Sequence, residues 1–510
     1  KTAYEITYGD WSSDVCSSDL VMSSSRTSFS SSTSLANLGW LRSGVVLLLF
    51  LGAWVAWTLW SNGQWEYQVI FLLLGGGGFL LFWQPVGFLY VLVFMLIVDV
   101  SGVSRDLIQI PGFIGIAGMG NTKIPESMSI LAVAHIVLSF CLRPGEFRKP
   151  LVGSLAVMIA TGFVGTMLGV RNHIGTNAFR DSLGYYFSIF FIIGSVLAAT
   201  PARAANLFRA IFYSTLLALL LCYIVMVVTL SSDYFYSSSY GMIYSACAYV
   251  LIAKLAGAPA NARRWLSAAV LFVLVAAIFI GRARGAMLAF AVGLVPLFWV
   301  LSFRAKIRIL AGLLVPGILL TLWLFAIERG AGRVDEPQFN RGARGIEAFT
   351  HVGDPDYDPT GSYRLYMWRL GVNGFLESPL LGKGYGWRIP VRAAAGYDEE
   401  LPAAAIHNSY LHTLACGGLL GFIPLVAVVG RYFLILSRQL VNRPSHIRRI
   451  WLAAACSIGL NFFLTAVTNV TFENVLSGII GWLLLALALR FATAADEQLE
   501  QVIPYRQVRL

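Results

Sequence analysis

The chain has 510 residues, of which 57% are hydrophobic and only 12% charged, and its mean hydropathy is +0.71. This is more apolar surface than a water-soluble core buries, so the composition excludes a soluble globular protein and favours an integral membrane protein. The net charge is +11. Polytopic membrane proteins commonly carry such an excess of Lys and Arg in their cytoplasmic loops, so the charge implies no nucleic-acid partner. The six cysteines show no paired spacing, and we expect no disulfide framework, no metal site and no cofactor.

The N-terminal segment differs from everything that follows it. Its first residues, KTAYEITYGDWSSDVCSSDL, are polar and resemble translated sequencing-adapter read-through. We therefore interpret residues 1–21 as an artefact and expect the natural protein to start at Met22. Residues 22–43 are Ser-rich and of low complexity, which predicts a disordered cytoplasmic N-terminus.

Apolar segments then recur along the chain, and a membrane-spanning helix needs about 20 mainly apolar residues. About fourteen candidates meet this need, eleven within 44–326 and three within 409–490. They lie at 44–60, 67–83, 86–100, 127–142, 151–169, 184–200, 206–230, 241–257, 265–281, 285–302, 309–326, 409–437, 450–468 and 474–490. The two segments that flank RARG could be half-spanning, so the predicted fold class is an all-α polytopic membrane protein with about 12–14 transmembrane helices.

The connections between these segments indicate the orientation. Five connections are basic: RPGEFRK (143–149), ARAANLFR (202–209), KLAGAPANARR (254–264), RAKIR (304–308) and RQLVNRPSHIRR (438–449). Short loops rich in Lys and Arg stay on the cytoplasmic side. Both termini, including the tail 491–510, are therefore predicted to be cytoplasmic, and the long loop 327–408 is predicted to face the outside.

This long loop is the one large polar segment between predicted helices. Its part SYRLYMWRLGVNGFLESPLLGKGYGW (362–387) alternates apolar and basic residues at helical spacing, with Leu365, Trp368, Leu370 and Phe375 on one side. We predict a short amphipathic helix that lies on the membrane, followed by a Gly-rich turn. The acidic stretch DPDYDP (354–359) lacks the later Glu of a calcium loop, and its Asp-Pro steps favour a solvated turn.

Three polar clusters share the predicted outer face. They are GRARGAML (281–288), the basic residues of the loop helix, and IHNSYLHTLACGGLLG (406–421) at the start of a predicted span. Each also has a plain structural interpretation, because arginines at helix ends snorkel to headgroups and glycines permit close packing. His407 and His412 are five residues apart and project to different helix faces, so they do not form an H-x-x-x-H metal site.

The stretches SYRLYMWRLGVNGFLESPLLGKGYG, HNSYLHTLACGGLLG and RARGAMLAF together resemble the O-antigen ligase and O-antigen polymerase superfamily of bacterial envelope glycosyltransferases. The resemblance is specific over about 280–425. The chain departs from the family pattern at Ala283, where the family often has serine, and at Ala415 and Cys416, where acidic residues are common.

This resemblance implies a GT-C-like glycosyltransferase architecture in the bacterial inner (cytoplasmic) membrane, with a large periplasmic loop. It implies transfer of a glycan from an undecaprenyl diphosphate carrier to an acceptor hydroxyl, on lipid A core or on a growing polysaccharide. The implied partners are this donor, a saccharide or lipid-linked acceptor, membrane lipids and other polysaccharide-assembly proteins.

The chemistry of this transfer suggests roles for three arginines. Negative charge develops on the leaving diphosphate, and a guanidinium neutralises it with bidentate, permanently charged donors. Arg284 is therefore the catalytic candidate of this type, and Arg282 and Arg364 are the substrate-binding candidates.

The attacking acceptor hydroxyl must lose a proton, which suits a neutral imidazole with a pKa near neutrality. His407 is accordingly the candidate general base. Asn408 and Tyr410 are candidates for orienting the sugar or the imidazole. Asp181, on the same predicted face, could bind sugar hydroxyls.

A second class of function fits the same features. Many helices and a cationic outer vestibule would equally serve a transporter or flippase of lipid-linked saccharide. Within the enzyme class, ligase and polymerase share the donor chemistry and differ in the acceptor, so the sequence leaves that choice open.

Overall fold

The computed structural model describes residues 85–99, 113–116, 120–123, 140, 145, 151–172, 175–229, 238–257, 262–281, 283–307, 309–311, 359–392, 398–402, 406–442 and 444–502. The sequence predictions for residues 1–43, for Arg282 and for the DPDYDP turn up to residue 358 lie outside these residues. The predicted spans 44–60 and 67–83 also lie outside them, and 127–142 and 309–326 lie mostly outside.

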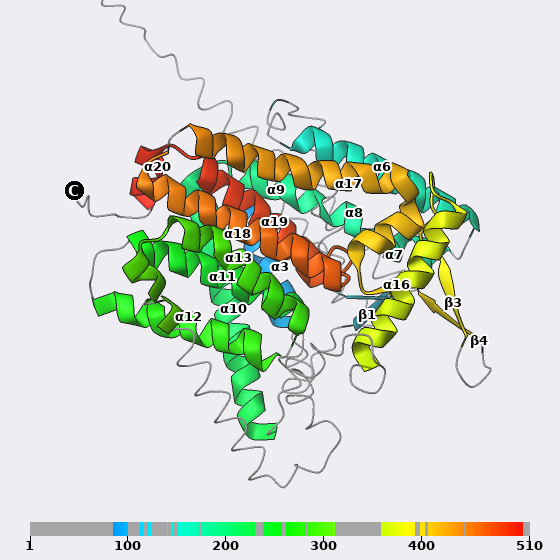
Figure 1. Ribbon diagram of the computed structural model, residues 1–510, viewed down its shortest axis with the longest axis horizontal. Coiled ribbons are helices and arrows are strands. Elements are labelled where there is room, and N and C mark those ends of the chain that lie inside the picture. Colours follow the sequence, from blue (N-terminus) through cyan, green and yellow to red (C-terminus); the bar gives the residue numbers. More distant parts are fainter. Residues whose placement is uncertain are drawn as a thin grey trace, which may run out of the picture. The chain divides into compact units, whose positions relative to one another are not determined.

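The described part is helical, with two short hairpins (Figure 1). Six of its helices are long and apolar enough to cross a membrane. They are α6 (Val152–Asn172), α10 (Pro201–Thr229), α11 (Ser238–Gly257), α17 (Ser409–Val441), α18 (His446–Thr468) and α19 (Val475–Thr493). Helices satisfy their own backbone hydrogen bonds, which the bilayer core requires. The protein is a multi-pass membrane protein, and the predicted all-α fold class is confirmed.

The remaining elements are shorter. The apolar ones are α3 (Pro85–Asp99), α8 (Leu183–Phe187), α9 (Ile189–Leu197), α12 (Ala262–Ile280) and α13 (Arg284–Val300). The others are α7 (Gly175–Asp181), α16 (Pro359–Glu377) and α20 (Asp496–Val502), with strands β1 (Phe113–Ile116), β2 (Gly120–Lys123), β3 (Arg388–Arg392) and β4 (Asp398–Pro402). The single span predicted at 184–200 is divided between α8 and α9 at Ser188, whose hydroxyl donates to the Tyr185 carbonyl at 2.5 Å. A serine that bonds back to its own helix in this way commonly marks a bend.

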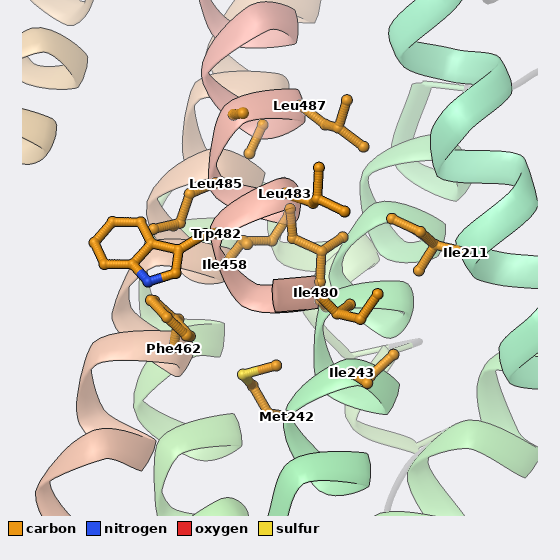
Figure 2. Close-up of a cluster of buried hydrophobic side chains, with 14 of the residues drawn as sticks. Ile211, Met242, Ile243, Ile458, Phe462, Ile480, Trp482, Leu483, Leu485 and Leu487 are labelled. Carbon is orange, nitrogen blue, oxygen red and sulfur yellow. The ribbon is translucent and has the colours of Figure 1, made fainter. Parts of the chain in front are cut away.

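Helices α11, α18 and α19 are the most enclosed spans of the described part. Their most apolar stretches are 83%, 78% and 89% buried, whereas those of α6 and α17 are only 33% and 28% buried. Helix α18 packs against α11, α13, α17 and α19, and α19 packs also against α9. Figure 2 shows the apolar side chains between α10, α11, α18 and α19, where the rings of Trp482 and Phe462 meet edge to face at 5.4 Å. This core supports the helix ends described below.

The last three spans begin at side-chain caps. The side chains of Asn408, Ser445 and Asn474 each accept a hydrogen bond from backbone N–H groups in the first turn of α17, α18 and α19, respectively. Short polar side chains at this position satisfy donors that the helix cannot. The sequence-predicted starts at 409 and 474 therefore lie within one residue of the observed ones.

Helix α16 packs against α17 and forms where an amphipathic helix was predicted (Figure 1). Its buried side differs in part from the predicted one. Met367 is fully buried, Gly371 faces Ile406 and Gly374 faces Trp387, whereas Leu365 is 38% exposed. The two glycines leave room for these large side chains, and this close packing determines the buried face. That α16 lies on the membrane stays a prediction.

The hairpin of β3 and β4 follows α16 and was not predicted from the sequence. Its antiparallel register pairs Arg388 with Pro402 and Arg392 with Asp398. Strands β1 and β2 form a second antiparallel hairpin.

Candidate functional site

Three helix ends meet at the start of α17. A Cβ atom on Gly285, in the first turn of α13, would overlap the hydroxyl of Thr468 at the end of α18. The next residue, Asn469, accepts a hydrogen bond from the backbone N–H of Ser409 at 3.2 Å. Arg284 and His407, which are far apart in the sequence, are thus brought to the same end of the helix bundle.

Arg284 is the first residue of α13 and is exposed. The preceding Ala283 provides no side-chain cap, and the first turn contains no acidic residue. The N-terminal end of a helix carries partial positive charge, which favours an anion there. The positive charge of the Arg284 guanidinium and the partial positive charge of the helix end therefore both favour an anion at this point.

His407 lies immediately before the cap of α17 and is half-buried. Its φ is +52°, in the left-handed region that a histidine rarely adopts. Burial and the nearby guanidinium of Arg364 lower the pKa of His407 below its usual value, because both disfavour a positive charge on the ring. The structure thus brings Arg364 of α16 close to His407, and burial and this cation both favour the neutral imidazole.

Asn408 and Tyr410 are engaged by the protein itself. The Asn408 carboxamide oxygen accepts from the backbone N–H groups of Tyr410 and Leu411, both at 3.0 Å. The Tyr410 hydroxyl donates to the Phe463 carbonyl at 3.1 Å, and its ring packs edge-on against Phe472. These contacts give both residues structural roles, and their binding of substrate stays a prediction.

Helix α17 is kinked at Gly418, whose φ of 59° and ψ of −161° are not helical. The loop between α16 and β3 inserts there. The N–H groups of Lys383 and Gly384 donate to the carbonyls of Ala415 and Cys416 at 2.9 Å each. The kink would otherwise leave α17 backbone groups without partners, so the loop and the kink stabilise each other.

The glycines around this loop permit close approach. Gly382, Gly384 and Gly386 all have positive φ, and a Cβ atom on Gly384 would lie 2.8 Å from the backbone nitrogen of Gly169 in α6. Gly417 and Gly421 make room for the hydroxyl group of Tyr185. The packing role expected for the glycines in α17 is therefore observed, with tyrosine side chains and a loop as the neighbours.

A buried polar cluster lies beneath the first turn of α17. His412 is fully buried, and its Nδ1 atom is 2.9 Å from Oε1 of Glu473, in the connection between α18 and α19. The hydroxyl of Ser409 donates to Oε2 of the same carboxylate at 2.5 Å. The Tyr385 ring packs edge-on against His412, with ring centroids 5.7 Å apart. His412 and His407 therefore have different surroundings, as their spacing predicted.

Asp181, at the end of α7, belongs to the same region. It lines a small pocket together with Tyr185, Tyr385, Thr413 and Glu473. Burial raises the pKa of Asp181 above its usual value, although His412 and two arginines oppose this shift. The sequence suggested Asp181 as a sugar ligand; its side chain is buried at this pocket, and its binding of sugar stays a prediction.

Glu473 is the residue of this region that sequence reasoning missed. It stands alone as an acidic residue in the short stretch TNVTFENV between two apolar spans. Ionisable residues between or within membrane helices are costly and commonly functional, and this signal could have identified it.

Comparison with known proteins adds one match. The model of the O-antigen ligase family matches residues 268–426, about a third of the chain. The matched segment covers most of α12, all of α13 and α16, and α17 beyond its kink, and it includes Arg284, Arg364 and His407. No curated protein matches the chain. The resemblance seen in the sequence is confirmed over this segment, and residues 268–426 are similar to the O-antigen ligase family.

Proposed function

We propose that this protein is a lipid-linked glycosyltransferase of the O-antigen ligase or polymerase type. The observation that carries the proposal is the convergence of Arg284, Arg364 and His407, all within the family-matched segment, at one end of the helix bundle. The donor is a glycan on undecaprenyl diphosphate, and the acceptor is a hydroxyl on lipid A core or on a growing polysaccharide.

The acceptor oxygen attacks the anomeric carbon of the donor sugar. His407 takes the proton of the acceptor hydroxyl as the new C–O bond forms, and its lowered pKa, which favours the neutral ring, suits this role. The bond from the anomeric carbon to the diphosphate breaks, and the electron pair leaves with the diphosphate. Arg284 neutralises the developing charge, assisted by the positive end of α13.

Arg364 has two effects in this scheme. Its guanidinium lies near enough to His407 to lower the pKa of the imidazole. A cation at this place also attracts the anionic donor, and Arg282, just before α13, adds a further positive charge. In the proposed arrangement the diphosphate lies on the arginine side and the acceptor hydroxyl on the His407 side.

The proposed orientation places both termini in the cytoplasm and the loop 327–408 in the periplasm of the bacterial inner membrane. The basic connections of the chain support it. Asn373→Cys introduces a thiol at an exposed position of α16. We expect a membrane-impermeant maleimide to label this variant in cells with an intact inner membrane, with the parent chain as control. Labelling only after the inner membrane is permeabilised would contradict the orientation.

The enzymatic proposal is tested with purified protein in detergent micelles. Undecaprenyl diphosphate-linked glycan from the strain that carries the gene serves as donor, and lipid A core and free polysaccharide are offered separately as acceptors. A new glycosidic product and released undecaprenyl diphosphate are expected, and the acceptor used distinguishes ligase from polymerase. Absence of product, together with movement of the donor across proteoliposome membranes, would instead favour a transporter or flippase.

A further inference from the structure

The backbone at His407 needs support from both sides. A left-handed conformation at a non-glycine residue is strained and persists only where the neighbouring structure fixes it. On the N-terminal side, Ile406 is fully buried, and its carbonyl accepts a hydrogen bond from the Trp368 indole at 3.0 Å. The preceding residue is thereby tied to α16.

On the C-terminal side, the support comes from the connection between α18 and α19. The Ser409 N–H donates to the Asn469 carbonyl, and the Ser409 hydroxyl accepts from the backbone N–H of Phe472, both at 3.2 Å. The same hydroxyl donates to Glu473 Oε2 at 2.5 Å. Ser409 is only two residues from His407, so these bonds fix the direction in which the chain leaves the histidine.

Glu473 makes a second contact to the same helical turn, because its Oε1 lies 2.9 Å from Nδ1 of His412. Its side chain is only 8% exposed. A buried carboxylate is costly unless it is paired and hydrogen-bonded, and each oxygen of Glu473 meets one of these two partners. The carboxylate is thus a bridge between the α18–α19 connection and the first turn of α17.

We propose that Glu473 is a positioning residue for His407. It acts through Ser409 and His412, and it holds the start of α17 so that the His407 imidazole faces the acceptor hydroxyl. This inference rests on the proposed function, and it adds a residue that lies outside the family-matched segment.

The test begins with two substitutions at Glu473. Glu473→Ala removes both contacts, and misplacement of the base should lower kcat about 10- to 100-fold with little change in KM. Glu473→Gln keeps the length of the side chain, an acceptor for the Ser409 hydroxyl and a donor for His412 Nδ1. We expect this conservative variant to restore most of the lost kcat, whereas no recovery with Gln would overturn positioning through these two contacts.

Asn474→Ala is the matched control. Asn474 lies in the same connection, but its side chain caps α19 by accepting from the Ser477 N–H at 3.1 Å. We expect this variant to lower thermal stability and to leave kcat per folded molecule unchanged. Equal kcat per folded molecule for Glu473→Ala and Asn474→Ala would overturn the proposal. If Glu473→Ala does not fold, Ser409→Ala, which removes one of the two contacts, takes its place in the same comparison.

Combination with His407→Ala separates this inference from the proposed function. If Glu473 acts through His407, the double variant should be no slower than His407→Ala alone. Additive losses on the slowed His407→Ala background would overturn the positioning role and leave the proposed function intact. An active His407→Ala variant would remove the proposed base, and the positioning inference would fall with it.

Discussion

Helix α19 and the first turn of α17 are both buried, but they bury different chemistry. Helix α19 is buried on nearly all sides, mostly with apolar side chains, and Trp482 near its centre is fully buried. The first turn of α17 buries Asn408, Ser409 and His412. Polar groups inside a membrane protein are costly without partners. Each of these three side chains has a hydrogen-bonding partner, whereas beyond its capped first turn α19 buries mainly apolar side chains.

The difference indicates that the two regions have different roles. The α18–α19 pair provides a stable scaffold, and the polar connection at its end holds the strained backbone of His407. Changes in α19 should therefore alter stability without altering chemistry, and changes at the start of α17 should alter chemistry first. The kink of α17 at Gly418 lies between the polar first turn and the rest of this helix, and it positions the loop that follows α16.

The largest expected effect is that of Gly418→Val at the kink. The φ and ψ of Gly418 lie in a region that is essentially restricted to glycine, and a Cβ atom there would be 2.5 Å from the Gly382 nitrogen. We expect no stably folded protein, measured as loss of the monodisperse peak in size-exclusion chromatography. Gly430→Val in the same helix, where nothing lies within 4 Å of the added Cβ, is the control and should stay monodisperse. Normal folding of both variants would show that the kink is dispensable.

The scaffold is tested by Trp482→Ala in α19. Loss of this fully buried ring from its contacts with Phe462 should cost about 3–5 kcal/mol of unfolding free energy. Thermal unfolding in detergent measures the change. Trp299→Ala, at a position that is 87% exposed, should leave the midpoint nearly unchanged. A similar midpoint for both variants would contradict the central role assigned to α18 and α19.

Tyr410→Phe should have a smaller effect. It removes one hydroxyl that donates to the Phe463 carbonyl, which is worth about 1 kcal/mol, and leaves the ring packing in place. We expect slightly lower thermal stability and an unchanged kcat per folded molecule. A raised KM at unchanged stability would instead support the substrate-binding role that the sequence suggested for Tyr410.

The pH dependence should change most subtly. The pKa of His407 is lowered by burial and by Arg364, so kcat/KM should rise with pH through a value below the usual histidine pKa of about 6.5 as the ring becomes neutral. Arg364→Gln removes one cause of the lowering and should move this acid limb to higher pH. A loss of donor binding in Arg364→Gln would lower kcat/KM without moving the acid limb, so the two effects can be told apart. An unmoved limb, or one displaced to lower pH, would argue that another group titrates.

Much of this scaffold is readable from the sequence, because long apolar runs in a bilayer have few alternatives to helix. The start predicted at 474 lies within one residue of the observed start of α19, where Asn474 caps the helix. The kink at Gly418 was not predicted, because it depends on a loop that arrives from elsewhere in the chain. Glu473 was missed for a related reason, since its partners His412 and Ser409 are 61 and 64 residues away.

The candidate residues for the chemistry were predicted from residue types and from a family resemblance, and the contacts that support them were not predicted. The structure brings His407, Arg284 and Arg364 to one end of the bundle, and their roles stay a prediction. The roles of Asn408 and Tyr410 as cap and as hydrogen-bond donor to the backbone depend on tertiary contacts. Polar residues next to a candidate base serve either the substrate or the fold, and only the geometry distinguishes these uses.

The turnover of His407→Ala tests the central claim most directly. Purified wild type and variant are compared in the detergent assay, with kcat expressed per folded molecule. A general base contributes about 10²- to 10⁴-fold, so a loss of this size is predicted with thermal stability close to that of the wild type. Near-normal turnover by His407→Ala would contradict the claim that this histidine carries the chemistry at the start of α17.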